Sequence, residues 1–217
     1  MCATKAGRPR RKRAGQYHHG DLRRALIEQA LRTIDAAGAE GLTLRGVGAA
    51  LGVSRTALYR HFADKEALLA AVAREGFRLL RERLLEAWEK DGRGAAGFEA
   101  MGGAYVRFAI EHPSHYRVMF GRFVESGERD AELASEAEGA FGALVDALTA
   151  LQRDGLARAE DPLLQARFVW SVTHGIAMLV IDGQLRCGDE DTAALNRYAV
   201  ERLRQALSAG PAPVENR

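Results

Sequence analysis

Side chains that can recognise another molecule are concentrated between residues 54 and 65 of this 217-residue sequence. Ser54 can cap the start of a short helix, because its hydroxyl can accept a hydrogen bond from a backbone N–H group in the first turn. Such a helix would bury Ala57, Leu58 and Phe62 and leave hydrogen-bonding groups on its outer face. The groups expected on that face are Arg55, Thr56, Tyr59, Arg60 and His61.

A second short helix is predicted just before this segment. Thr43 can cap it, and its apolar residues Leu44, Val47 and Leu51 recur at intervals of three and four. The helix ends at Gly52, which tolerates the left-handed backbone of a tight turn. Two short helices joined by a glycine-containing turn, the second rich in hydrogen-bonding side chains, indicate a helix-turn-helix.

A long helix is predicted to follow directly. Asp64 can cap it, and no helix breaker occurs from Lys65 to Trp88. This start places Lys65 near a helix N-terminus, where phosphate binds favourably. Gly46 and Gly48 lie inside the first short helix, and each costs about 1 kcal/mol relative to alanine. Either this helix is less stable than usual, or close packing requires the glycines.

These segments together resemble the tetracycline-repressor (TetR) family of bacterial transcription regulators. The resemblance rests on the pattern L-T-L-R-x-V-x-x-x-L-G-V-S-x-x-A-L-Y-R-H-F-x-D-K-E-A-L-L over residues 42–69, and it extends upstream through Y-H-H-G-D-L-R at residues 17–23. Farther on, H-P-x-x-Y-R-V-M-F at 112–120 and W-x-x-x-H-G at 170–175 resemble a C-terminal domain found in one branch of that family.

The resemblance implies roles for the residues of the motif. In this family the exposed face of the second short helix is the recognition face, so Arg55, Thr56 and Ala57 are expected at base edges. Arginine can bind guanine O6 and N7, and a threonine or alanine methyl can contact thymine. The alternative for Tyr59 and Arg60 is that neither residue contacts DNA, in which case Tyr59 is a partly buried aromatic residue and Arg60 is a solvated surface charge. Other contacts are expected to phosphates, which fix the register of the protein on DNA but do not select its sequence. The full set of residues expected to contact DNA is Thr43, Arg45, Ser54, Arg55, Thr56, Ala57, Tyr59, Arg60, His61 and Lys65.

The net charge of +2 conceals an asymmetry along the chain. Residues 1–65 hold 13 Lys or Arg against 5 Asp or Glu, whereas the remainder holds 18 against 24. A basic end of this kind is the footprint of a protein that binds a polyanion. Residues 1–16 contain six of the basic residues and no acid, and they are expected to be disordered alone. They are either a solubilising tail or an arm that follows phosphates or enters the minor groove.

Helical periodicity, with no alternating strand pattern, predicts an all-α fold of about nine helices. A three-helix N-terminal domain containing the helix-turn-helix would precede a helical domain for ligand binding and dimerisation. We expect the acidic segment before Phe141 to lead into a helix, and a long apolar helix over about 162–185. The expected domain boundaries are 1–16 for a disordered basic arm, 17–67 for the DNA-binding domain, 68–209 for the effector and dimerisation domain, and 210–217 for a flexible tail.

Composition argues against several other classes of protein. No stretch approaches the roughly 18 apolar residues of a membrane span, and the basic N-terminus lacks the apolar region of a signal peptide. Cys2 and Cys187 give neither a disulfide framework nor a zinc spacing, and Pro113 interrupts the His112-x-x-His115 pair. We therefore expect a cytoplasmic protein with no membrane partner, no metal and no cofactor. No nucleophile with a base and no paired carboxylates can be assigned, so an enzyme is not expected.

Aromatic residues and methionines in the C-terminal half can surround a mostly apolar pocket for a small-molecule effector, or can form plain core. His174, on an apolar helix four residues after Trp170, is either a hydrogen-bonded core histidine or a ligand contact. The residues expected at the effector are Met101, Tyr105, Phe108, Tyr116, Met119, Phe120, Phe141, Trp170, His174 and Met178.

The last two predicted helices bear on oligomeric state. The helix from residue 162 is apolar almost all round and must be covered on every side, unless a monomer uses both faces in its own core. The resemblance implies pairing with a second copy, so that a homodimer binds two half-sites about 34–36 Å apart in double-stranded DNA. We expect a sequence-specific repressor that a small apolar effector releases from a palindromic operator. The alternatives are a ligand-dependent activator of the same family and a non-specific DNA-binding protein.

Overall fold

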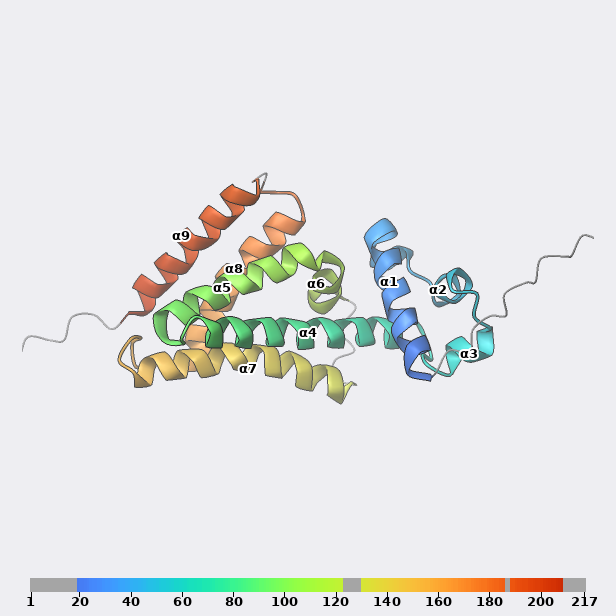
Figure 1. Ribbon diagram of the computed structural model, residues 1–217, viewed down its shortest axis with the longest axis horizontal. Helices are drawn as coiled ribbons and strands as arrows, with labels where there is room; N and C mark the ends of the chain where they lie inside the picture. The colour runs from blue at the N-terminus through green and yellow to red at the C-terminus, as the bar shows by residue number, and fades with distance from the viewer. Residues whose placement is uncertain (1–18, 123–129, 186–187, 209–217) are drawn as a thin grey trace, which may run out of the picture.

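The computed structural model describes residues 19–122, 130–185 and 188–208, which form nine α-helices and contain no strand (Figure 1). The predicted all-α fold is therefore confirmed. The basic arm, the C-terminal tail, Cys2, Cys187 and the first two residues of the upstream motif lie outside the described residues. The helices are α1 (His19–Gly41), α2 (Leu44–Ala50), α3 (Arg55–Tyr59), α4 (Lys65–Lys90), α5 (Gly94–Glu111), α6 (Pro113–Phe120), α7 (Ala131–Arg153), α8 (Pro162–Ile181) and α9 (Asp189–Leu207).

Three side-chain caps define the helix-turn-helix, as the sequence predicts. The Thr43 hydroxyl accepts from the Gly46 N–H at 3.1 Å and starts α2. The Ser54 hydroxyl accepts from the Ala57 N–H at 3.2 Å and starts α3. The Asp64 carboxylate accepts from the Ala67 N–H at 2.8 Å and starts α4. Each cap satisfies a donor that the helix itself leaves open, so local sequence alone sets where these three helices begin.

The glycine within α2 has a packing role. Gly48 is buried, and a Cβ atom at this position would lie 3.0 Å from Leu58 Cδ2 on α3. A larger residue would therefore press the two short helices apart. The glycines of this helix were expected either to make it less stable than usual or to be required by close packing. Close packing explains Gly48.

Helix α4 connects the two ends of the molecule. Its first turns bury Leu68, Leu69 and Val72 in the core shared with α1–α3, and its later turns lie between α5 and α7 (Figure 1). Because α4 is one continuous helix, a displacement of the helices around its C-terminal half can reach the helix-turn-helix.

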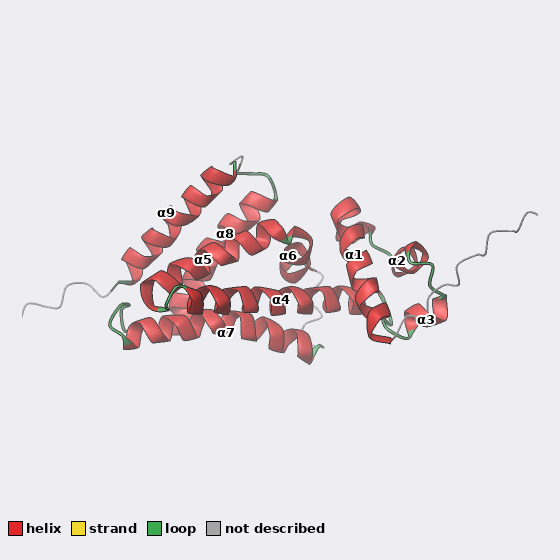
Figure 2. Cartoon of the chain, in the orientation of Figure 1, coloured by secondary structure: helices red, strands yellow, loops and turns green. Residues whose placement is uncertain are grey.

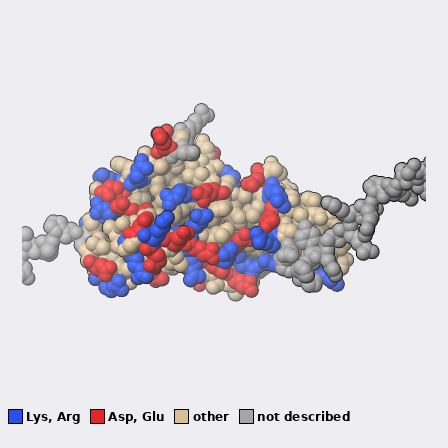
Figure 3. All heavy atoms as spheres, viewed as in Figure 1, with Lys and Arg blue, Asp and Glu red and all other residues tan. Residues whose placement is uncertain are grey.

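On the face drawn in Figure 3, acidic and basic side chains are intermingled over the part of the molecule built around α4.

Two helix boundaries differ from the sequence prediction (Figure 2). Helix α7 already begins at Ala131, because Asp130 caps it by accepting from the Leu133 N–H at 3.0 Å. The acidic residues Glu132, Glu136 and Glu138 before Phe141 are therefore helical. Helix α8 ends at Ile181 and not at residue 185, since the chain turns at Gly183 with φ of +66°.

The expectation that no stretch approaches a membrane span needs correction for α8. Among the described helices, α8 alone is long and apolar enough to cross a membrane by length and composition. It packs against α5, α7 and α9 and carries the polar residues Gln165 and Arg167. Core helices of proteins outside membranes meet the same criterion.

Candidate nucleic-acid interface and ligand cavity

The short helix α3 presents its polar side chains to solvent at one end of the molecule. Arg55, Thr56 and Arg60 are exposed, and the Tyr59 side chain is 41% exposed. The Arg55 guanidinium lies 5.5 Å from the centre of the Tyr59 ring, within the range of a cation–π contact. This contact holds the arginine beside the tyrosine on the outer surface, where both could reach a groove.

The other residues predicted to contact DNA flank this face. Thr43, Arg45 and Ser54 are exposed, whereas Ala57 and His61 are half-buried. The structure therefore brings the predicted base-reading and phosphate-contacting side chains together at the start of α2 and along α3. None of the ten predicted DNA-contacting residues is fully buried.

Lys65 has a structural partner as well as a place at a helix N-terminus. Its ammonium group donates to the backbone carbonyl of Glu40 at 3.1 Å, and the side chain is half-buried. This bond ties the start of α4 to the end of α1.

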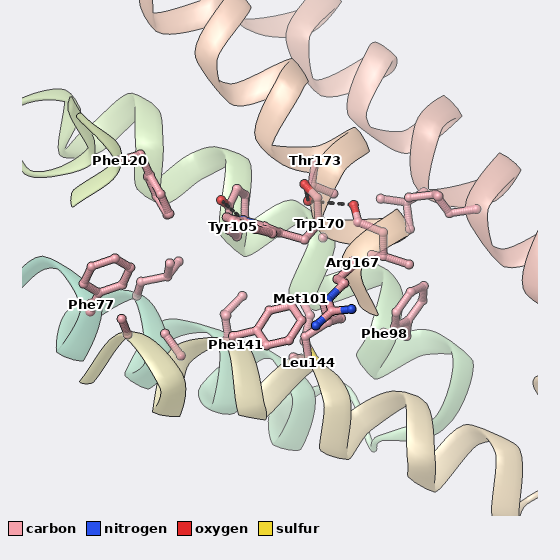
Figure 4. Close-up of a pocket in the computed structure, with 18 residues that line it drawn as sticks. Phe77, Phe98, Met101, Tyr105, Phe120, Phe141, Leu144, Arg167, Trp170 and Thr173 are labelled. Carbon is pink, nitrogen blue, oxygen red and sulfur yellow. Dashed lines mark hydrogen bonds between the residues drawn. The ribbon is translucent and has the colours of Figure 1, made fainter. Parts of the chain in front are cut away.

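A second candidate site is an apolar cavity of about 360 Å³ among the helices of the C-terminal half (Figure 4). Its volume falls within the range of about 300–1,000 Å³ that is usual for small-molecule sites. The wall combines residues of α4, α5, α6, α7, α8 and α9, so no single helix forms it. The lining residues are Phe77, Leu80, Leu84, Phe98, Met101, Gly102, Tyr105, Phe120, Ala137, Ala140, Phe141, Leu144, Arg167, Val169, Trp170, Thr173, Val200 and Leu203.

Half of the residues predicted at the effector line this cavity, and the other half do not. Those in the wall are Met101, Tyr105, Phe120, Phe141 and Trp170.

The five residues outside the cavity wall have other surroundings. Phe108, Tyr116 and Met119 are fully buried in the core, and Met119 packs against Gly76 of α4, where a Cβ atom would lie 2.4 Å from its sulfur. His174 and Met178 are half-buried on α8. The aromatic and methionine pattern identifies buried positions here, but burial and contact with the cavity are different properties.

A chain of hydrogen bonds runs from the cavity wall into the core. The Trp170 indole N–H donates to the Tyr105 hydroxyl at 2.9 Å. The Tyr105 and Tyr116 hydroxyls are 2.9 Å apart, and the Tyr116 hydroxyl lies 2.8 Å from His174 Nδ1. Burial raises the pKa of Tyr105 to about 12, raises the pKa of Tyr116 and lowers the pKa of His174. The cluster is therefore uncharged near neutral pH, and His174 is engaged with Tyr116.

Several wall residues were not among the predicted ones. Phe98 lies three residues before Met101 on α5, and Arg167 lies three residues before Trp170 on α8. Helical spacing from Met101 was a usable signal for Phe98, whereas the charge of Arg167 pointed away from an apolar wall. Among the described residues, no group of three or more His, Cys, Asp or Glu side chains could hold a metal ion.

His115 lies in the junction between α6 and the N-terminal helices. It is 7% exposed, and no hydrogen-bond partner reaches its Nε2 atom within the described residues. Next to it, the Ser114 hydroxyl donates to the Asp35 carboxylate of α1. The pKa of His115 is lowered to about 4, mainly by burial and to a smaller extent by the nearby His112, while Asp35 opposes both effects.

This buried imidazole predicts acid sensitivity. Between pH 6.5 and about 4 the unfolded chain binds a proton at His115 that the folded protein does not bind, so the free energy of unfolding falls as the pH falls through that window. A shift of this size is worth about 3 kcal/mol. Urea unfolding at a series of pH values should show a steeper loss of stability in the wild type than in His115→Leu, which has no group to protonate there. If the free energy of unfolding falls equally steeply with pH in the two proteins, His115 is not the source of the acid sensitivity.

The fold and these two sites define the class of protein. A helix-turn-helix joined by a long helix to an all-α domain is the arrangement of a helix-turn-helix transcriptional regulator. Two family models match the chain: the bacterial regulatory proteins of the tetR family over residues 26–72, and the tetracyclin repressor-like C-terminal domain over residues 98–203.

Individual relatives agree with these models. The uncharacterized HTH-type transcriptional regulator Rv0681 of Mycobacterium tuberculosis is 30% identical over 184 residues, which cover 83% of this chain and 79% of that protein. The tetracycline repressor protein class C of Escherichia coli is 49% identical over 51 residues, 24% of this chain and 23% of that repressor. A solved structure of a Rhodococcus sp. RHA1 protein of unknown function superimposes with a TM-score of 0.79 at 31% identity, covering 89% of this chain and 98% of that one. The chain belongs to the TetR family of DNA-binding transcriptional regulators.

Proposed function

We propose that this regulator is a homodimeric repressor that leaves a palindromic operator when a small, mostly apolar effector enters the cavity. The cavity carries the proposal. It has the size and lining of a ligand site, and its wall includes Phe77 and Leu80 of α4, the helix that begins directly after the helix-turn-helix. The tetracycline repressor protein class C, which matches 51 residues of this chain, is by its name a repressor.

Helix α6 offers a physical route between the cavity and the DNA-binding end. Phe120, its last residue, lines the cavity, and Ser114, near its start, donates to Asp35 of α1. Between them, the Arg117 guanidinium donates to the carbonyl of Ile181 at the end of α8. An effector that displaces Phe120 would move a short helix held at α1 and α8. To empty the operator, it must bind the released conformer far more tightly, since a shift from 1:99 to 99:1 needs a preference of about 10⁴.

The DNA-facing roles are proposed as follows. Arg55, Thr56 and Ala57 of α3 read base edges in the major groove, while Thr43, Tyr59, His61 and Lys65 contact phosphates. Arg45, Ser54 and Arg60 are proposed to contact DNA beside them. The exposure of α3 and the capped helix N-termini support this division.

The second subunit is proposed to cover α8 and α9. Large apolar side chains of these helices face solvent in the single chain, where water contact is unfavourable. Leu164 is 65% exposed, Phe168 49% and Tyr198 63%. The proposal includes domain boundaries at residues 17–67 and 68–209, a cytoplasmic location, and membership of the branch that carries the Trp170-x-x-x-His174-Gly175 motif.

Selection of sequences from a random DNA pool by the purified protein tests the first half of the proposal. We expect a palindromic consensus that is bound about 10³-fold or more tightly than random duplex. Binding without a consensus would mean a non-specific DNA-binding protein. A reporter gene controlled by the selected operator then decides the sign of regulation. An activator raises expression when it is bound to the operator, whereas a repressor lowers expression in the same state.

Filling the cavity should separate DNA binding from the response to effector. Ala140 of α7 is buried in the cavity wall, so Ala140→Phe places a ring in the vacant volume. We expect this variant to bind the selected operator as the wild type does, but not to be released by compounds that release the wild type. Fluorescence anisotropy of labelled operator measures both properties.

The matched control is the same substitution at Ala147 of α7, which is equally buried but does not line the cavity. Ala147→Phe should lose about 1–3 kcal/mol of stability through overpacking. Release of Ala140→Phe at wild-type effector concentrations would place the effector elsewhere.

A further inference from the structure

One charged side chain interrupts the otherwise apolar and neutral wall of the cavity. Of the eighteen lining residues, Arg167 alone carries a charge. In Figure 4 its side chain extends from α8 toward Met101 and Leu144, with the guanidinium nitrogens directed into the cavity. Arg167 is also exposed in the single chain, so it lies at the edge of the cavity and not in its interior.

The remaining polar groups of the wall are already engaged within the protein. The Trp170 N–H donates to Tyr105, and the Tyr105 hydroxyl is in contact with Tyr116. The Thr173 hydroxyl donates to the backbone carbonyl of Val169 at 3.1 Å. In contrast, no hydrogen bond or ion pair within the described chain occupies the Arg167 guanidinium. Its five N–H donors are the main unused hydrogen-bonding capacity facing the cavity.

We propose that the effector is an amphipathic monocarboxylate whose apolar body fills the cavity and whose carboxylate pairs with Arg167. This inference rests on the proposed function, because it names the chemical class of that effector. The planar guanidinium matches the two oxygens of a carboxylate through parallel hydrogen bonds. Because Arg167 is the one cation among the lining residues, a second anionic group buried deeper in the cavity would have no cationic partner, which favours a ligand with a single carboxylate.

The position of Arg167 gives the complex a defined orientation. A cation at the mouth can hold the carboxylate near water while the apolar part enters toward Phe77 of α4 and Phe120 of α6, which both line the cavity. The charged group then keeps part of its hydration, and the apolar surface is removed from water. Ligand binding in this orientation places apolar bulk against the helices proposed to carry the response.

The test is isothermal titration calorimetry with four probes of equal chain length: decanoate, decanamide, 1-decanol and decylamine. The wild type should bind decanoate about tenfold or more tightly than the amide or the alcohol, and should bind the amine most weakly. Arg167→Met keeps the length and apolar stem of the side chain, so it should lose the preference for decanoate while its affinity for the amide is unchanged. Arg197→Met, a change at an exposed arginine of α9 outside the cavity, should behave as the wild type.

The outcomes separate this inference from the proposed function. Equal affinity for decanoate and decanamide, absence of decanoate binding, or an undiminished decanoate preference in Arg167→Met would each overturn the carboxylate assignment. If a neutral compound binds and releases the selected operator, the cavity is an effector site but the proposed class is wrong. If decanoate binds through Arg167 without weakening operator binding, the ligand class is supported and the role of the cavity in release is refuted.

Discussion

Replacing Arg55 with alanine is expected to weaken binding to the selected operator by about 30-fold to 10⁴-fold, while binding to random duplex changes far less. One good bidentate contact to a base is worth about 1–3 kcal/mol, and a dimer would lose two such contacts. Arg55 is exposed on α3 and lies against the Tyr59 ring, so its removal leaves the core of the helix-turn-helix intact. Fluorescence anisotropy at one fixed salt concentration, with operator and random DNA in parallel, gives the specificity ratio.

The control for lost positive charge is Arg153→Ala at the end of α7. Arg153 is an exposed arginine whose guanidinium pairs with Asp154, far along the chain from the helix-turn-helix. The Arg153→Ala substitution removes the same charge from the protein without altering α3. We expect operator affinity to stay within a factor of about two, because an exposed ion pair contributes little free energy. If Arg55→Ala lowers affinity for operator and random DNA equally, Arg55 is a phosphate contact and another residue reads the bases.

The helix-turn-helix was predictable because its signals are local. Thr43, Ser54 and Asp64 each lie directly before an apolar helical pattern, and each accepts the backbone hydrogen bond expected of a cap. A cap and its partner are three residues apart, so no long-range information is needed to place it. The glycine of the turn, Gly52, likewise has the positive φ that its residue type permits, at +65°.

The cavity could be predicted only in part, because its wall depends on contacts between distant segments. Helical spacing shows that Tyr116 and Met119 are apolar-face residues, but it does not show whether that face meets another helix or a void. The bond between Tyr116 and His174 joins residues 58 positions apart. Arg167 was missed for a related reason: a single arginine on an apolar helix suggests a surface position, and only the neighbouring helices turn that position into the mouth of a cavity.

The double substitution Leu164→Glu with Phe168→Glu is expected to convert the protein into a monomer and to lower operator affinity by about 10²-fold to 10⁴-fold, the usual gain from linking two binding units. Both side chains are about half or more exposed on α8 in the single chain, so the glutamates can stay hydrated in the folded monomer. In a dimer they would bury four unpaired carboxylates at the interface, which is strongly unfavourable. Sedimentation velocity gives the oligomeric state, and anisotropy with the full operator and with one half-site gives the affinities.

Leu85→Glu supplies the matched control, because Leu85 is an exposed leucine of α4, 39% exposed, outside the proposed interface. It should remain a dimer with wild-type operator affinity, and circular dichroism should show native helix content in both variants. A double variant that stays dimeric would place the subunit interface away from this face of α8. A monomer that still binds the full operator as tightly as the wild type would mean that one helix-turn-helix supplies the affinity, and the palindromic arrangement of half-sites would then have no physical basis.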